Sequence, residues 1–221
     1  MADITEMART VFCEKGYNET VISEIAQRLG VVEGTIYRYF PSKRDLLIEV
    51  AGDWYEQMLS DYDEQLKGIR GTWNRLRFMV WRHLTVIHDD PAMCRLVMGE
   101  LRVLPEYRNT PVYELNRAYT KRTTAIIEEG MASGEFRKDV PFQIVRDMIY
   151  GGVEHHTWAY LRGVGDFSPD EAADNIVDII YRGLANPAST TDTANANGQA
   201  INRLEKVTQR LEQLANGPGA H

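Results

Sequence analysis

The chain of 221 residues has little cysteine, with only Cys13 and Cys94 present. Two thiols cannot form a disulfide framework or a four-thiolate metal site within one chain, and they are typical of a reducing cytoplasm. The sequence also lacks a run of ~20 consecutive apolar residues. Its first residues show no basic stretch followed by an apolar one. We therefore expect a cytoplasmic protein that is neither exported nor inserted into a membrane.

An excess of positive charge is missing as well, because the formal net charge at pH 7 is -7. This excludes a surface coated with basic residues for nonspecific nucleic-acid binding, but it does not exclude a local basic face. The composition, 43% hydrophobic and 26% charged, is ordinary for a globular protein. The length fits one large domain or a small domain joined to a larger one.

Catalytic and cofactor motifs are also absent from the sequence. It contains no G-x-S-x-G elbow, no phosphate-cradling glycine loop and no G-x-G-x-x-G strand-turn-helix pattern. His155 and His156 follow Glu154, but adjacent residues on a helix point about 100° apart and cannot bind the same metal ion. We expect no enzymatic activity, no cofactor and no metal.

Hydrophobic periodicity predicts an all-α fold. Apolar residues recur at three- and four-residue intervals, and the alternating runs of β-strands are absent. Three short helices are expected over 3–15, 21–28 and 33–39. Longer helices are expected over 42–67, 72–88, 111–132, 141–162 and 169–184, with a shorter one after Pro91. Ser42 before Asp45, and Ser168 before Pro169, are typical helix starts.

Composition divides the chain into four parts. Residues 1–47 form a compact trihelical unit, and residues 48–186 a larger helical domain. Residues 187–198 are small and polar and read as a linker. In 199–221 we expect an amphipathic helix and a tail, with apolar residues at the spacing of two heptads. This last helix either docks on the body or supports a dimer.

Residues 16–47 carry the clearest functional pattern. A helix with a buried apolar face ends at Gly30, which permits the positive backbone angle of a turn. The next helix buries Ile36 and Phe40 and exposes polar and aromatic side chains. This is the pattern of a helix-turn-helix, whose second helix enters the major groove of DNA. Lys43 and Arg44 then begin a helix, where cations are unfavourable unless a phosphate lies nearby.

The residues from Phe12 to Leu47 read F-x-x-x-G-Y … T-x-x-x-I-A-x-x-x-G-V-x-x-G-T-I-Y-x-Y-F-x-S-K-x-x-L-L. This pattern resembles the N-terminal domain of the TetR/AcrR transcriptional regulators. The resemblance implies a homodimeric repressor whose two recognition helices bind a palindromic double-stranded DNA operator. It also implies a C-terminal domain that binds a small hydrophobic molecule and releases the DNA.

The resemblance assigns eight residues to DNA. Thr20 matches a phosphate-contacting hydroxyl. Positions that face bases are Glu33, Gly34, Thr35 and Arg38, and positions that contact the backbone are Tyr37, Tyr39 and Lys43. The guanidinium of Arg38 can donate to O6 and N7 of one guanine, which would contribute ~1 to 3 kcal/mol of discrimination. A phosphate contact is the equally weighted alternative.

Val32 and Glu33 depart from the family pattern, and the trihelical unit is acidic. Val32 stands where a capping Ser or Thr is usual, which forfeits about 1 kcal/mol. Residues 1–50 contain six Lys/Arg and eight Asp/Glu, a net of -2. We therefore expect modest DNA affinity and a shallow salt dependence. These features also favour the alternative function, a helical ligand-binding or adaptor protein that keeps the trihelical unit as structure only.

By the resemblance, the helices over 141–162 and 169–184 form a four-helix dimer interface with a second copy. A pocket is expected among the other helices, lined by aromatic, thioether and polar side chains. The candidates are Trp54, Met58, Trp81, Met98, Tyr119, Thr123, Tyr150, His155 and Trp158. Residues 128–152 resemble regulators that respond to acyl-CoA thioesters. The expected effector is therefore a hydrophobic small molecule such as a fatty acid or an acyl-CoA.

Overall fold

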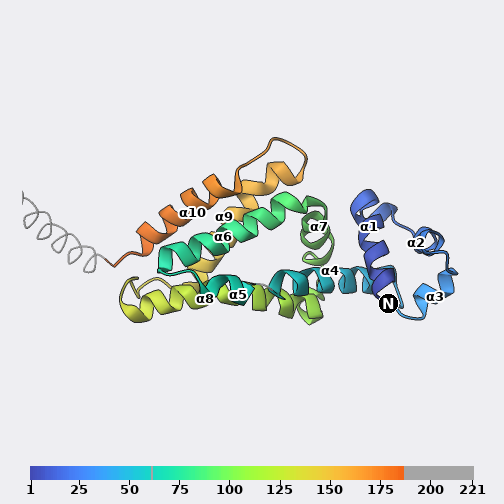
Figure 1. The fold of residues 1–221 in the computed structure, drawn as a ribbon, viewed down its shortest axis with the longest axis horizontal. Helices are drawn as coiled ribbons and strands as arrows, with labels where there is room; N and C mark the ends of the chain where they lie inside the picture. The colour runs from blue at the N-terminus through green and yellow to red at the C-terminus, as the bar shows by residue number, and fades with distance from the viewer. Residues whose placement is uncertain (61, 187–221) are drawn as a thin grey trace, which may run out of the picture.

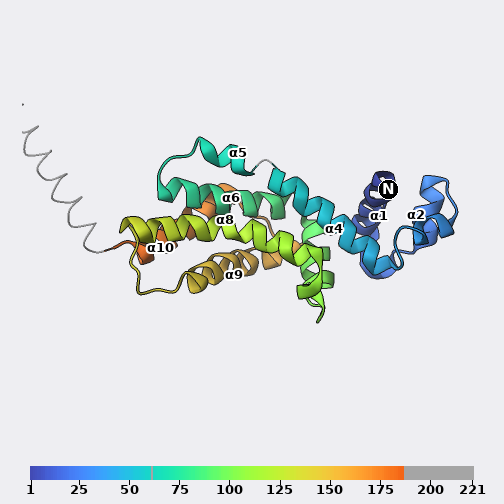
Figure 2. The same ribbon diagram turned by 90° about the horizontal axis from the view of Figure 1, so that it is seen from below.

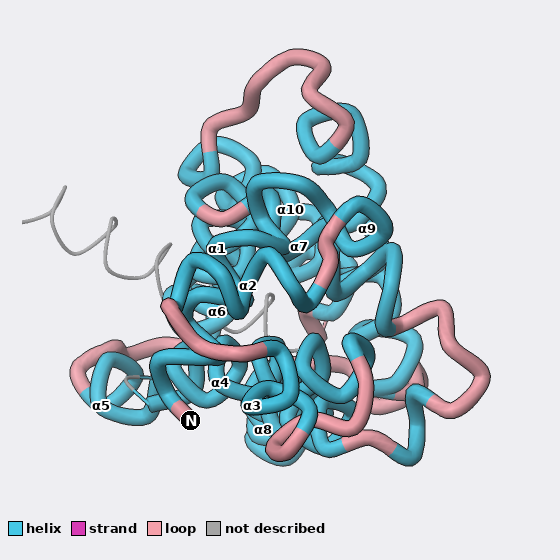
Figure 3. The backbone as a smooth tube through the Cα atoms, turned by 90° about the vertical axis from the view of Figure 1, so that its right-hand side faces the viewer, coloured by secondary structure: helices cyan, strands magenta, loops and turns pink. Residues whose placement is uncertain are grey.

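A computed structural model describes residues 1–60 and 62–186 of the chain. In this part every regular element is helical, apart from an isolated bridge between Phe136 and Ala185, and Figure 3 shows helices joined by loops. The prediction of an all-α fold is confirmed. The predicted linker over 187–198 and the predicted helix in 199–221 lie outside the described residues.

The first three helices form a small unit at one end of an elongated molecule (Figure 1). They are α1 (Ala2–Glu19), α2 (Ile22–Leu29) and α3 (Glu33–Tyr37). Phe12, Ile25 and Ile36 are fully buried between them. Gly30 ends α2 with φ 69°, the left-handed conformation predicted for the turn.

Helix α4 (Lys43–Ser60) leads from this unit into the larger domain (Figure 1). Its start is capped as predicted, because the Ser42 hydroxyl accepts from the backbone N–H of Asp45 (3.2 Å) and donates to its carboxylate (2.7 Å). The predicted helix over 42–67 corresponds to two described helices, one on each side of residue 61, which lies outside the described residues. Helix α4 is described to Ser60, and α5 spans Tyr62–Lys67.

The larger domain packs its remaining helices around α6 (Thr72–Asp89), which lies against α8 (Pro111–Ser133), α9 (Phe142–Leu161) and α10 (Pro169–Leu184). Figure 2 shows α8 and α9 running side by side. Helix α7 (Pro91–Leu96) continues into the π-helical turn η1 (Val97–Leu101), and η2 (Tyr107–Asn109) precedes α8. Helix α8 also packs on α4, so α4 contributes to the cores of both parts.

Local signals explain where these helices begin and end. The side chains of Thr110 and Ser168 cap α8 and α10, each followed by a proline in the first turn. Gly134 ends α8 with φ 82°. Among the described residues, no helix combines the length and apolar character needed to cross a bilayer.

Candidate functional site

Helix α3 and the residues after it form an exposed surface at the end of the molecule. Ile36 and Phe40 point into the core and fix the helix, which leaves the other side chains outside. The residues exposed here are Val32, Glu33, Gly34, Tyr37, Arg38 and Tyr39, and Thr35 is half-buried. No side chain caps the helix at Val32, as predicted. We call this group the α3 surface.

Arg38 is the cation of the α3 surface. Its guanidinium lies over the ring of Tyr39, 5.0 Å from the centroid, and donates to the Tyr39 hydroxyl at 3.3 Å. Within the described residues it has no carboxylate partner. Four other cations of residues 1–50 pair with carboxylates: Arg9 with Asp90, Lys15 with Glu24, Arg28 with Glu14 and Glu24, and Arg44 with Glu106. Arg38 is therefore the basic group best placed to meet an anionic partner.

The structure does not place Thr20 as the resemblance implies. Its side chain is fully buried, and its hydroxyl donates to the carbonyl of Gly16 at 2.7 Å. Gly16 has φ 80°, so α1 is interrupted there and its carbonyl needs a partner other than a helical N–H. Because the hydroxyl is engaged inside the protein, it is not available to a phosphate.

Lys43 also differs from the expectation. Its ammonium donates to the carbonyls of Tyr17 (2.7 Å), Thr20 (2.8 Å) and Asn18 (3.3 Å), and it lies 4.5 Å from the centroid of the Tyr17 ring. Carbonyls at the end of a helix lack helical donors and carry partial negative charge. The cation at the start of α4 is thus compensated by the end of α1 and does not require a phosphate.

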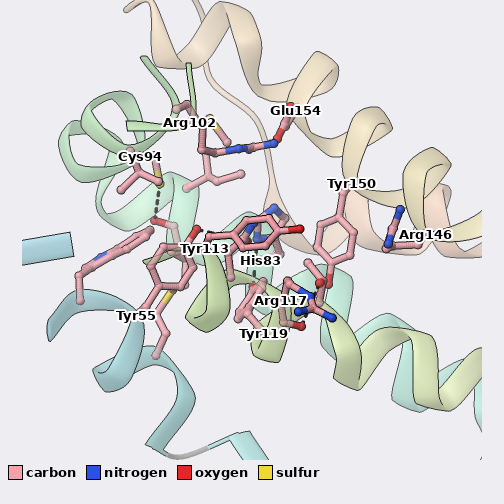
Figure 4. Close-up of a pocket in the computed structure, with 18 of the residues that line it drawn as sticks. Tyr55, His83, Cys94, Arg102, Tyr113, Arg117, Tyr119, Arg146, Tyr150 and Glu154 are labelled. Carbon is pink, nitrogen blue, oxygen red and sulfur yellow. Dashed lines mark hydrogen bonds and ion pairs between the residues drawn. The ribbon is translucent and has the colours of Figure 1, made fainter. Parts of the chain in front are cut away.

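A cavity of ≈ 280 Å³ lies in the larger domain between α4, α6, η1, α8 and α9 (Figure 4). Its apolar wall includes Trp54, Met58, Val86, Ile87, Val97 and Met98. Five of the nine predicted pocket residues line it: Trp54, Met58, Met98, Tyr119 and Tyr150.

The other four predicted residues do not line the cavity. Thr123 lies behind Tyr150, with the two hydroxyls 2.8 Å apart, and Trp81 packs on Phe78. His155 and Trp158 are exposed on α9 and are not among the lining residues. One face of α9 points to the cavity and another points outward. The cavity face carries Arg146, Tyr150 and Glu154, which follow one another at intervals of one turn.

A network of neutral side chains forms the polar part of the cavity wall. The Tyr62 hydroxyl donates to that of Tyr119 at 3.2 Å, and the Tyr119 hydroxyl lies 3.0 Å from Nδ1 of His83. Burial, together with the charge of Arg102, lowers the pKa of His83 to about 4. Burial raises the pKa of Tyr119 and Tyr150. At neutral pH all of these groups are uncharged.

Charged residues of α8 and α9, and Arg102 directly after η1, also line the cavity. Arg102 pairs with Glu154, Arg146 with Asp147 and Arg117 with Glu114. Figure 4 shows Arg102, Arg117 and Arg146 around the central His83. Our sequence reasoning missed Arg117 and Arg146. Helical spacing could have identified Arg146 as a lining residue, because it precedes the predicted pocket residue Tyr150 by one turn.

The outward face of α9 carries an apolar stripe without a partner in the described chain. Ile144, Met148 and Trp158 are each at least half exposed, and Ile179 of α10 is 69% exposed. Gly151 lies on the same stripe, with open space where a side chain would be. We call these residues the α9–α10 face. Contiguous exposed apolar side chains of this kind mark an interaction surface.

Clusters of three or more potential metal-ligating His, Cys, Asp or Glu side chains are absent from the described residues.

Comparison with known families matches two models to the chain. The model for bacterial regulatory proteins of the tetR family covers residues 4–50, and the tetracyclin repressor-like C-terminal domain covers residues 70–184. Similar curated proteins include the fatty acid metabolism regulator protein of Bacillus subtilis, 24% identical over 183 residues, which are 83% of this chain and 94% of that protein. The transcriptional repressor KstR2 of Rhodococcus jostii is 24% identical over 190 residues, with 84% and 91% coverage.

Solved structures share the fold. The transcriptional regulator FadR of Bacillus subtilis, determined in complex with stearoyl-CoA, superposes with a TM-score of 0.73. It is 24% identical, and the match covers 83% of this chain and 98% of that one. FadR of Bacillus halodurans superposes with a TM-score of 0.71 at 23% identity, with 83% and 98% coverage.

The contrast between Lys43 and Arg38 gives a first prediction. We expect Lys43→Met to lower the free energy of unfolding by about 1.5 to 3 kcal/mol, because charged hydrogen bonds to three carbonyls are lost. Arg38→Ala is the matched control, and we expect it to change unfolding by less than ~0.5 kcal/mol. Urea denaturation measures both. An unchanged midpoint for Lys43→Met would show that the carbonyl contacts contribute nothing to stability.

Proposed function

This chain belongs to the TetR family of bacterial regulatory proteins, and from this premise we propose that it is a transcriptional repressor that leaves its DNA operator when a hydrophobic effector binds. One observation carries the proposal: α4 joins an exposed helix-turn-helix surface at its start to the cavity of the larger domain at its other end. The family is one of regulators, so we propose no catalytic activity. The protein acts in the cytoplasm, where its operator lies.

The α3 surface is the proposed DNA contact. Helix α3 enters the major groove, where Glu33, Gly34 and Thr35 face the base edges. Arg38 reads a guanine or contacts a phosphate, and the hydroxyls of Tyr37 and Tyr39 contact the backbone. Thr20 and Lys43 support this surface from inside. Since few free cations lie here, the proposed affinity depends weakly on salt.

The α9–α10 face is the proposed interface of a homodimer. A two-fold axis would bring the same apolar stripe of each copy together, as an isologous interface requires. Gly151 and Gly152 allow the two copies of α9 to approach closely. The dimer then holds two α3 surfaces at a fixed separation, which makes a palindromic operator the matching target.

An acyl-CoA is the effector class that the cavity favours. At about 30 Å³ for each water-sized group, a cavity of ≈ 280 Å³ holds roughly nine such groups. An acyl chain of about eight carbons fits this space beside the apolar wall. Three arginines line the cavity, and a phosphate would compete for them with the carboxylates that they pair with. The names of two relatives, a fatty acid metabolism regulator and a FadR bound to stearoyl-CoA, support the same class.

Effector and DNA are coupled, in this proposal, through α4 and α7. Trp54 and Met58 of α4 line the cavity. Asp90 caps α7 through the backbone N–H of Met93 and also pairs with Arg9 of α1 at 2.6 Å. An effector that displaces these helices changes the tilt of the helix-turn-helix unit, so the two copies no longer fit one duplex.

Selection of bound fragments from random DNA tests the proposal. We expect an enriched palindrome at low salt, and we expect octanoyl-CoA to release it. Arg38→Ala should weaken the base preference at one position of the operator, because ~1 to 3 kcal/mol of discrimination between the correct and the wrong base is lost. If Arg38 instead contacts a phosphate, the variant will bind all duplexes more weakly. Absence of any enriched site would favour the adaptor function.

A charge placed in the α9–α10 face tests the dimer. We expect Met148→Glu to yield monomers in sedimentation velocity, because two carboxylates would face each other near the two-fold axis at a cost of several kcal/mol. Val103→Glu is the matched control, since Val103 is also exposed but lies outside this face. A dimer that survives Met148→Glu unchanged would refute the assignment of the interface.

A further inference from the structure

His83 of α6 has a ring nitrogen that is not used within the protein. Nδ1 lies 3.0 Å from the Tyr119 hydroxyl, whereas Nε2 has no hydrogen-bond partner in the described residues. Nor is Nε2 among the side-chain atoms that are sealed inside this part of the chain without a partner. His83 is half-buried and lines the cavity, so its unpaired Nε2 faces the cavity.

The hydrogen-bond network assigns the proton on this ring. The Tyr62 hydroxyl donates to the oxygen of Tyr119, so the single proton of Tyr119 is directed to Nδ1 of His83. Nδ1 is then the acceptor of the neutral ring, and Nε2 carries the hydrogen. The relay from Tyr62 through Tyr119 polarises the ring and strengthens Nε2 as a donor.

The Nε2–H group of His83 lies between an apolar side and a cationic side of the cavity. The ring of His83 contacts that of Tyr150, with centroids 5.2 Å apart, and Arg146 is one turn away from Tyr150 on α9. In Figure 4, Tyr55 and Cys94 lie on one side of His83, and Arg146 lies on the other. An acyl chain that fills the apolar side, beside Tyr55 and Cys94, ends with its carbonyl group near His83, and the rest of the molecule continues past His83 toward the polar side of the cavity.

We propose that Nε2–H of His83 recognises a carbonyl oxygen of the effector, namely the thioester carbonyl of an acyl-CoA. This inference rests on the function proposed above. A carbonyl oxygen pairs with the donor, whereas a methylene group at the same place leaves it desolvated and unpaired. Since a buried unpaired donor is unfavourable, His83 makes the cavity discriminate between a thioester and an otherwise identical thioether.

Isothermal titration of the full-length protein with two probes tests the inference. Octanoyl-CoA carries the carbonyl, and S-octyl-CoA has a methylene in its place. We expect the wild-type protein to bind octanoyl-CoA roughly five- to 150-fold more tightly. In His83→Phe we expect this preference to vanish through weaker binding of octanoyl-CoA, with little change for S-octyl-CoA.

Two further variants separate recognition from structural damage. His83→Gln keeps an N–H donor and should retain most of the preference. His88→Phe changes another histidine of α6 that stacks on Tyr160 and does not line the cavity, so the preference should be unchanged. Equal binding of both probes by the wild-type protein would overturn the inference and leave the proposed effector class standing. Failure of both probes to bind would overturn the effector class itself, and the inference with it.

Discussion

Helix α4 is the constraint on which the rest of the structure depends, because it is one rigid element shared by two functional surfaces. Its first residue, Lys43, is bonded to the carbonyls at the end of α1, and Trp54 and Met58 line the cavity about three to four turns later. A helix rises about 1.5 Å for each residue, so its 18 residues span roughly 27 Å without a joint. Any rotation of α4 at the cavity is therefore transmitted to the helix-turn-helix unit.

The ion pairs that link the helix-turn-helix unit and the start of α4 to the larger domain are too weak to couple effector binding to DNA binding alone. Arg9 and Arg44 are 41% and 49% exposed, so their pairs with Asp90 and Glu106 contribute about 0 to 1 kcal/mol each. Coupling between two ligands in one protein is typically ~1 to 3 kcal/mol. The packing of α1 on α4 and α7 supplies the larger share, and the pairs set the register of that packing.

Local structure was predictable from the sequence because its causes are local. The caps at Ser42 and Ser168 and the turn at Gly30 depend on residues within one turn of each other. The family resemblance assigned Thr20 and Lys43 to DNA, and nothing near them in the sequence reveals that the end of α1 meets the start of α4. The carbonyls that engage both side chains are brought there by the tertiary fold.

Which residues line the cavity also could not be fully predicted from the sequence. Periodicity identified α9 as apolar, but a helix that is apolar on two faces does not reveal which face points inward. His155 and Trp158 therefore appeared as pocket residues, although they lie on the exposed face. Arg146 lies on the cavity face with Tyr150, and only the tertiary fold shows that this face of α9 points inward.

The central claim is that the cavity and the α3 surface exclude each other's ligands, and reciprocity tests it most directly. The measurement is the affinity of octanoyl-CoA for the dimer, alone and saturated with its selected operator duplex. The account predicts that the duplex weakens octanoyl-CoA binding by the same factor by which octanoyl-CoA weakens duplex binding, about 5- to 150-fold. Equal affinity for the free and the DNA-bound protein would contradict it.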